Sequence, residues 1–100
     1  MPHQIPTFIH DPEAVLDYGF DFTTWLQAGE TITAAVWTLP TVGIGAVTKS
    51  LVHPESITDG KCVVWLQGGV DDQNYLAVCH ITTSAGRQDD RSLILRVKHR

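Results

Sequence analysis

The sequence contains little charge. Charged residues make up 18% of the 100 positions, below the share of about a quarter that is usual for soluble proteins. The formal net charge is −4 and no basic run is present. No nucleic acid is therefore expected as a partner, because nucleic-acid-binding proteins present basic surfaces. So few charges on a small chain favour a surface that is covered in an assembly.

Long apolar runs are also missing. No stretch reaches the ~18–20 apolar residues that a transmembrane helix needs, so no membrane partner is expected. The first six residues, Met-Pro-His-Gln-Ile-Pro, lack the charged and apolar regions of a signal peptide. We therefore expect a single domain that is made and folded in a cytoplasm.

Cysteine is scarce. Cys62 and Cys79 are the two cysteines, and no Cys-x-x-Cys spacing supports a structural zinc site. A hairpin that turned symmetrically about Val70 and Asp71 would place the two cysteines opposite each other, which makes a disulfide geometrically possible. Because there is no secretion signal, two small, buried, reduced thiols are the favoured interpretation.

The motifs of common catalytic, metal and phosphate sites are absent. There is no Gly-x-Ser-x-Gly, His-Glu-x-x-His or Walker sequence. The segment Gly43-Ile-Gly45 lacks the further residues of a phosphate loop, and Asp17 and Asp21 have no further oxygen ligands nearby. The five histidines follow no ligand spacing and are interpreted as scattered surface residues; they stand at positions 3, 10, 53, 80 and 99. We therefore predict no enzyme, no metal and no cofactor.

The sequence does contain a series of β-strand patterns. Residues 15–22 alternate apolar with polar or glycine residues, as a half-buried strand does. A second strand is expected over residues 30–39, with shorter strands near 7–9 and 46–49. Residues 61–97 hold three β-branched or aromatic runs separated by turn-rich gaps, which we interpret as a three-stranded antiparallel meander.

These patterns predict an all-β fold, a single immunoglobulin-like β-sandwich of six to eight short strands. Asp59-Gly60 is a turn signal before the third confident strand. One helical turn over residues 23–29 is expected to end at Gly29, which can adopt a positive φ. Tyr75 follows Asp71 and Asp72 as the tyrosine of a tyrosine corner would.

The N-terminus is expected to be an extended arm. Prolines at positions 2, 6 and 12 lack the N–H that a central strand donates, so residues 1–13 are assigned to the arm and residues 14–100 to the sandwich domain. Asp11-Pro12-Glu13 predicts a turn or a short helical start. The arm either frays or orders against a neighbouring subunit, and deletion of residues 1–10 is expected to leave the fold intact.

Two regions are candidates for contact with other proteins. The first is the arm, with the apolar residues Ile5, Phe8 and Ile9. The second is a dense polar cluster at the hairpin tip over residues 84–91, formed by Arg87, Asp89, Asp90 and Arg91. This cluster is either a salt-bridging patch against a neighbouring subunit or a solvated turn, and the solvated turn is slightly favoured.

Two stretches resemble a group of small virion proteins of tailed bacteriophages. The first runs from Val15 to Ile32 and includes Asp17-Tyr18, Trp25-Leu26 and Gly29-Glu30-Thr31. The second runs from Val63 to Val97 and includes Trp65-Leu66, Gly68-Gly69, Tyr75, Cys79, Thr82-Thr83, Gly86-Arg87 and Arg91-Ser92. Residues 40–60 match loosely, and Phe22 stands where relatives often have tryptophan.

Members of this group are described as fibre–tail adaptor or head-to-tail region proteins. The resemblance implies a non-enzymatic structural subunit in the neck or tail of the virion, made in the host cytoplasm and repeated around a homo-oligomeric ring. Its partners would be portal, adaptor, tail or fibre subunits. The resemblance identifies no contact residues.

Two alternative functions stay open at this point. A capsid decoration protein can also be a small sandwich, and its copy number in the virion would distinguish it. A carbohydrate-binding module would need aromatic side chains exposed on a sheet face, and the candidates are Trp25, Trp37 and Trp65. Packing in the core is the preferred interpretation of all three tryptophans.

Overall fold

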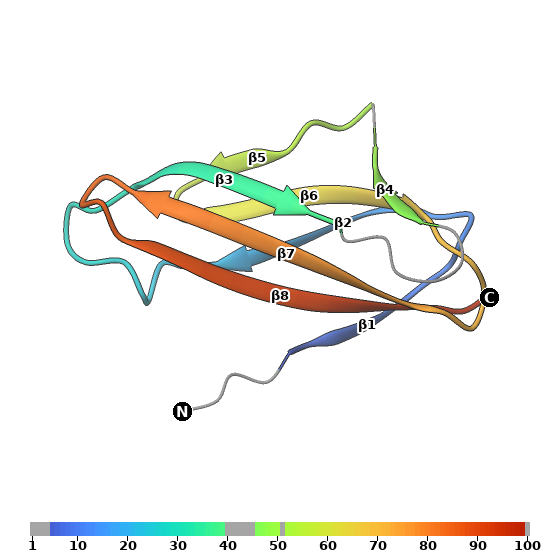
Figure 1. The fold of residues 1–100 in the computed structure, drawn as a ribbon. Helices are drawn as coiled ribbons and strands as arrows, with labels where there is room; N and C mark the ends of the chain where they lie inside the picture. Colours follow the sequence, from blue (N-terminus) through green and yellow to red (C-terminus); the bar gives the residue numbers. More distant parts are fainter. Residues whose placement is uncertain (1–4, 40–45, 51, 100) are drawn as a thin grey trace.

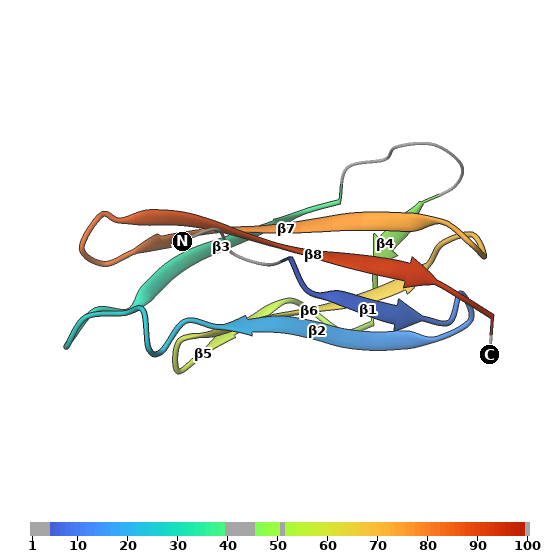
Figure 2. The ribbon, with the colours of Figure 1, turned by 90° about the horizontal axis from the view of Figure 1, so that it is seen from below.

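The chain folds as a two-layered β-sandwich in a computed structural model that describes residues 5–39, 46–50 and 52–99 (Figure 1). The two layers are seen edge-on in Figure 2. Within the described residues no helix is long and apolar enough to cross a membrane. The predicted all-β sandwich is confirmed, and the immunoglobulin-like arrangement stays a prediction. The predictions for Pro2, His3, Pro40 and Gly43-Ile-Gly45 lie outside the described residues.

Each sheet gathers strands from distant parts of the sequence. The first sheet has the order β1-β8-β7-β3, with β1 at Thr7–His10, β3 at Ile32–Thr38, β7 at Asn74–Thr83 and β8 at Gln88–Val97. In the second sheet β6 (Lys61–Gly68) pairs with β2 (Val15–Asp21), β4 (Val47–Lys49) and β5 (Ser56–Thr58). All pairs are antiparallel except β1 with β8. The strand β5 was not predicted.

The predicted three-stranded meander is wrong in its first half. β6 lies in the second sheet and β7 lies in the first, so residues 69–73 cross from one layer to the other. Only β7 and β8 form the expected hairpin. Two strands that face each other across a core show the same alternation of buried side chains as two strands that pair within one sheet. The sequence pattern therefore could not separate the two arrangements.

This crossing also changes the setting of the cysteines. Cys62 on β6 and Cys79 on β7 are both fully buried and both free thiols, and they lie in opposite sheets. The two thiols do interact with each other, as the sequence suggested, but they meet across the core and not across a hairpin. Burial raises the pKa of both thiols, that of Cys79 to about 12, so both are protonated and unreactive at neutral pH.

The core lies between the sheets and is built from alternate residues of the long strands. The buried side chains include Cys62, Val64 and Leu66 of β6, Ala77, Cys79 and Ile81 of β7, and Leu93, Leu95 and Val97 of β8. The predicted aromatic face of β2 is the inward face, because Phe20 stacks on the buried Trp37 of β3 with ring centroids 5.7 Å apart. Aromatic packing of this kind joins the two layers.

Most of the predicted turns are present. Asp59 and Gly60 have φ angles of 51° and 79° and close the β5–β6 hairpin. At the start of β7 the hydroxyl of Tyr75 accepts a hydrogen bond of 2.9 Å from the backbone N–H of Val70. This contact is the one expected of a tyrosine corner. The side chain of Asp11 accepts from the N–H of Glu13, as predicted for a turn there.

The prediction of scattered surface histidines is wrong for His10. Its side chain is fully buried, and its Nδ1 lies 2.7 Å from the hydroxyl of Tyr18 on β2. Its carbonyl accepts a hydrogen bond from the N–H of Lys98 beyond β8. Burial lowers the pKa of His10. The described part of the arm is therefore tied to the sandwich, which argues against the expectation that residues 1–10 can be deleted without harm to the fold.

Candidate interaction surfaces

Two surfaces contain four of the contact residues predicted from the sequence, and the other three lie on β8 next to the first surface. The first, the loop end, is formed by the connection 22–31, the β5–β6 turn at 59–60 and the β7–β8 turn at 84–87. The second, the edge surface, is formed by exposed apolar side chains of β1, β2 and the residues beside them: Ile5, Phe8, Ile9, Val15 and Leu16.

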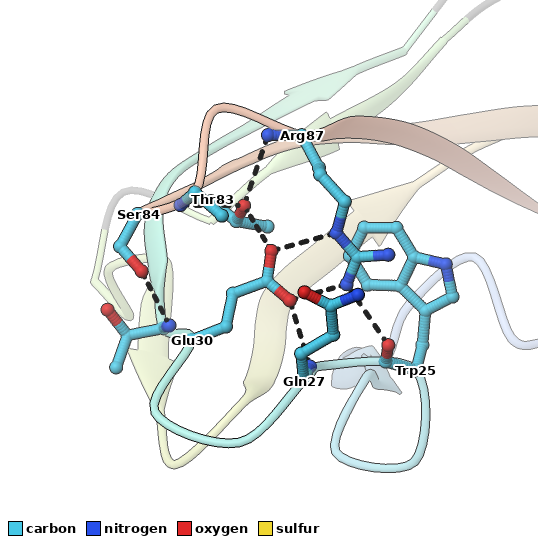
Figure 3. Close-up of polar contacts among 8 residues, drawn as sticks. Trp25, Gln27, Glu30, Thr83, Ser84 and Arg87 are labelled. Atoms are coloured by element: carbon cyan, nitrogen blue, oxygen red, sulfur yellow. Dashed lines mark hydrogen bonds and ion pairs between the residues drawn. The ribbon is translucent and has the colours of Figure 1, made fainter.

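A buried carboxylate organises the loop end. The side chain of Glu30 is only 3% exposed and accepts hydrogen bonds from Thr83 Oγ1 at 2.6 Å, Arg87 Nε at 2.9 Å and the backbone N–H of Gln27 at 2.9 Å (Figure 3). Arg87 Nε binds Glu30 Oε2, and Arg87 Nη2 donates to Glu30 Oε1. The hydrogen bonds from Arg87, Gln27 and Thr83 lower the pKa of Glu30 to about 2. Glu30 is therefore ionised at any physiological pH.

Arg87 completes this network, which we call the Glu30–Arg87 clamp. Its guanidinium carbon lies 3.9 Å from the centroid of the Trp25 ring, and Nη2 donates to the Trp25 carbonyl at 3.1 Å. The guanidinium thus satisfies a carboxylate, a carbonyl and an aromatic face at once. These contacts turn Arg87 toward its own chain, so it is a positioning residue of the loop end.

The backbone joins the same two segments. The N–H of Ser84 donates to the Thr31 carbonyl at 2.8 Å, and the N–H of Thr31 donates to Ser84 Oγ at 3.0 Å. The N–H groups of Trp25 and Leu26 both donate to the Phe22 carbonyl, which forms the single helical turn predicted here. Gly29 ends this connection with a φ of 78°. The loop end is therefore fixed by contacts within the chain.

The other three residues of the polar cluster lie on β8 beyond the turn. Arg91 places its guanidinium carbon 4.3 Å from the centroid of the Phe22 ring and so covers that side of the core. Asp89, near the start of the strand, is half-buried and forms an ion pair with Arg91, with Oδ2 3.9 Å from the Arg91 Nε. Asp90 is 62% exposed and binds Nδ1 of His80, while Gln88 binds its Nε2. These two partners raise the pKa of His80. Of the cluster, Asp90 thus faces outward, whereas Asp89 lies on the same side of β8 as the buried Leu93.

The edge surface is open. β1 is an edge of the first sheet and β2 is an edge of the second, and they lie side by side (Figure 2). The Phe8 and Tyr18 rings join them, with centroids 5.6 Å apart. Ile9 is 52% exposed, and five of the ten large apolar side chains recorded as exposed in the described residues belong to this surface. Exposed apolar side chains are thus concentrated at this edge of the sandwich.

The three tryptophans are held by contacts within the chain. Trp37 is buried, as preferred from the sequence, the Trp25 ring lies under Arg87, and the Trp65 ring stacks on His53 with centroids 4.2 Å apart. In the described part of the chain there is no cluster of three or more His, Cys, Asp or Glu residues that could hold a metal ion. These observations give the carbohydrate-binding alternative no support.

The sequence pointed to Arg87 but missed its partners. Glu30 lies 57 positions earlier in the chain, and such a pair cannot be recognised without the register of β3 against β7. Glu30 and Arg87 both fall within the stretches that resemble phage proteins, which was the available signal. A contact role for Ile5, Phe8, Ile9, Arg87, Asp89, Asp90 and Arg91 stays a prediction.

One comparison with known proteins identifies a family. A family model described as "Podophage GP4 fiber-tail adaptor protein gp77" matches residues 10–96, which is most of the chain. No curated protein matches the chain. The matched range includes β2 to β7, nearly all of β8 and the Glu30–Arg87 clamp. Of the edge surface it includes Val15 and Leu16, whereas Ile5, Phe8 and Ile9 precede it.

Proposed function

Because this chain belongs to the podophage fibre–tail adaptor family, we propose that it forms a ring in the neck and tail region of the virion. Membership of the family makes the chain a structural protein of a podophage virion with a tail fibre adaptor role. In the proposed ring it links the portal and tail proteins to the tail fibres. We further propose that it is made in the host cytoplasm and has no enzymatic activity.

The observation that carries the proposal is the Glu30–Arg87 clamp. An adaptor that joins two large assemblies must hold its docking loops in one conformation, because loops that order on binding reduce the affinity. The buried Glu30 carboxylate and Arg87 connect the 22–31 segment to the β7–β8 turn before any partner arrives. The loop end is thus preorganised for docking.

We assign different partners to the two surfaces. Asp90 stands beside the clamp with an exposed carboxylate, and Asp89 pairs with Arg91 next to it. We assign both to a tail or fibre protein. The edge surface is apolar and we assign it to a neighbouring subunit of the ring. A symmetric ring repeats each weak contact, and contacts that are linked in this way bind with a much higher overall affinity than one contact alone.

Incorporation into particles tests the proposal. Phage that carry Phe8→Ser or Ile9→Ser should yield purified virions depleted in the adaptor, whereas Leu76→Ser, at an exposed apolar residue of the interior strand β7, should incorporate normally. These substitutions replace the deletion of residues 1–10, which would remove β1 and the buried His10. The folded state of each purified variant is checked by its Tm.

Two outcomes count against the proposal. Normal incorporation of both edge variants would reject the role assigned to the edge surface. Many copies spread over the capsid, seen in a particle reconstruction, would favour the decoration alternative over a ring at the tail.

A further inference from the structure

We propose that two copies of this chain pair through β3, edge to edge and antiparallel, about a two-fold axis at Val36. β3 is an edge of the first sheet, and among the described strands it pairs with β7 alone. An edge strand presents a row of unpaired N–H and C=O groups, which form a template for another strand. This contact goes beyond the proposed ring and does not depend on it.

β3 differs from the other edge strands in length and charge. It has seven residues and contains no charge and no proline. By contrast β2 contains Asp17 and Asp21, β4 has three residues including Lys49, β5 has three residues and β1 has four. Charge and shortness are the usual protections against edge pairing. β3 has only the irregularity in its pairing between Ile32 and Ala34, which leaves residues 34–38 as a regular, uncharged edge.

The side chains of β3 indicate the register. Val36 is 55% exposed, whereas its neighbour Trp37 is buried. An antiparallel partner centred on Val36 places the two Val36 side chains directly opposite each other on the outer face, where β-branched pairs are stabilising. Ala34 then faces Thr38 of the partner copy, and no charged side chain meets another.

A second copy matches this edge better than a strand of unrelated sequence. The two copies of residues 34–38 overlap along their full length, antiparallel pairs are slightly more stable than parallel ones, and isologous two-fold contacts are the commonest kind between identical chains. The strand β5 contacts β3, and its Ile57 is an exposed apolar residue. Ile57 can therefore extend the contact beyond the backbone.

The contact would leave the loop end and the edge surface free. β1 and β3 stand at opposite edges of the first sheet (Figure 1). A dimer formed through β3 can therefore expose two loop ends and two edge surfaces to other virion proteins.

Light scattering after size-exclusion chromatography of the purified full chain tests the pairing. We expect a concentration-dependent dimer whose association constant falls by about tenfold or more in Val36→Lys and in Val36→Glu, because like charges then face each other across the axis. An equimolar mixture of the two variants should recover the dimer, because Lys then faces Glu. Leu76→Lys is the matched control, since Leu76 is exposed on the same sheet but on an interior strand, and its dimer should be unchanged.

Several outcomes would overturn the proposal. They are a wild-type chain that stays monomeric at every concentration, a Val36→Lys variant that dimerises normally, and a mixture that stays monomeric, which would mean that β3 receives a different strand. Thr38→Lys, at the end of the same edge, provides a second variant if Val36→Lys fails to fold. Because virion incorporation is measured separately, a wild-type chain that never dimerises but is incorporated normally rejects this inference and leaves the proposed function intact.

Discussion

The loop end and the edge surface differ in whether their side chains are already paired within the chain. At the loop end Glu30 and Arg87 satisfy each other and their surroundings, so little binding capacity remains in the clamp itself. At the edge surface Ile9 and its apolar neighbours have no such cover. The comparison shows that the most conspicuous charged residues of the sequence fix the shape, whereas plain aliphatic residues are left available for partners.

Glu30→Gln should have the largest effect on stability, because it removes the ion pair that fixes the loop end. The amide keeps the size of the side chain but leaves Arg87 without its opposing charge. An unpaired charge in a partly buried site destabilises the fold. We expect the largest fall in Tm among the variants described below. Glu13→Gln, at an exposed glutamate of the 11–14 turn, is the matched control. Equal Tm values for the two variants would show that the clamp does not hold the fold.

Acid should remove the clamp without a mutation. The pKa of Glu30 is about 2 in the folded chain, against an ordinary value of 4.5, because of the hydrogen bonds from Arg87, Gln27 and Thr83. A depressed carboxyl pKa stabilises the fold above the ordinary value, and this contribution is lost as the pH falls toward about 2. The difference in unfolding free energy between wild type and Glu30→Gln should therefore shrink between about pH 4.5 and pH 2. A constant difference in urea titrations would contradict this.

A milder acid effect is expected where β1 joins the sandwich. Burial lowers the pKa of His10, and Asp11, which acts in the opposite direction, has the smaller effect. The Tyr18 hydroxyl lies beside the imidazole Nδ1, whereas the Lys98 N–H donates to the backbone carbonyl of His10 and not to its ring. Neutral His10 therefore stabilises the fold above pH 6.5, and this contribution is lost as the pH falls from 6.5 through the folded pKa.

Hydrogen exchange in β1 measures this effect. Protection of the β1 amides should decrease with acid in wild type and respond less in His10→Gln. His80 provides a comparison of opposite sign, because Asp90 and Gln88 raise its pKa. Its contribution is present below pH 6.5 and lost as the pH rises through the folded pKa. An equal acid response in wild type and His10→Gln would assign the effect to another group.

The smallest effect on stability is expected at the edge surface. Ile9→Ser changes an exposed side chain, and surface substitutions of this kind usually alter the unfolding free energy by no more than about 0.5 kcal/mol. Urea unfolding should therefore barely distinguish the variant from wild type. A loss well above 1 kcal/mol would mean that Ile9 belongs to the folded unit, and the contrast between the two surfaces would disappear.

Local patterns predicted most of the strands but not their partners. The alternation in residues 15–22, the Asp59-Gly60 turn and the contact of Tyr75 all depend on neighbours close in sequence, and all are present. The assignment of β6 and β7 to one sheet failed because alternation shows which side chains face inward and does not show which strand lies beside which.

For the candidate surfaces, too, single residues were predictable from the sequence and their partners were not. Arg87 was recognisable as part of a dense polar cluster, but its partner Glu30 becomes visible only once β3 lies against β7. The burial of His10 was missed because three prolines made the arm look detached, whereas parallel pairing with β8 holds residues 7–10 in the sheet. Proline restricts pairing at its own position and says little about the residues between two prolines.

The crossing at residues 69–73 has a consequence for the order of folding events. Only β5–β6 and β7–β8 pair with a strand adjacent in sequence, so these two hairpins can close quickly. The pairs β2–β6 and β3–β7 must wait for the closure of long loops, which is slow and entropically costly. Until then β6 and β7 are tethered by a short connection with neither sheet complete. The topology therefore predicts that β2 and β3 join their sheets after the two hairpins have formed.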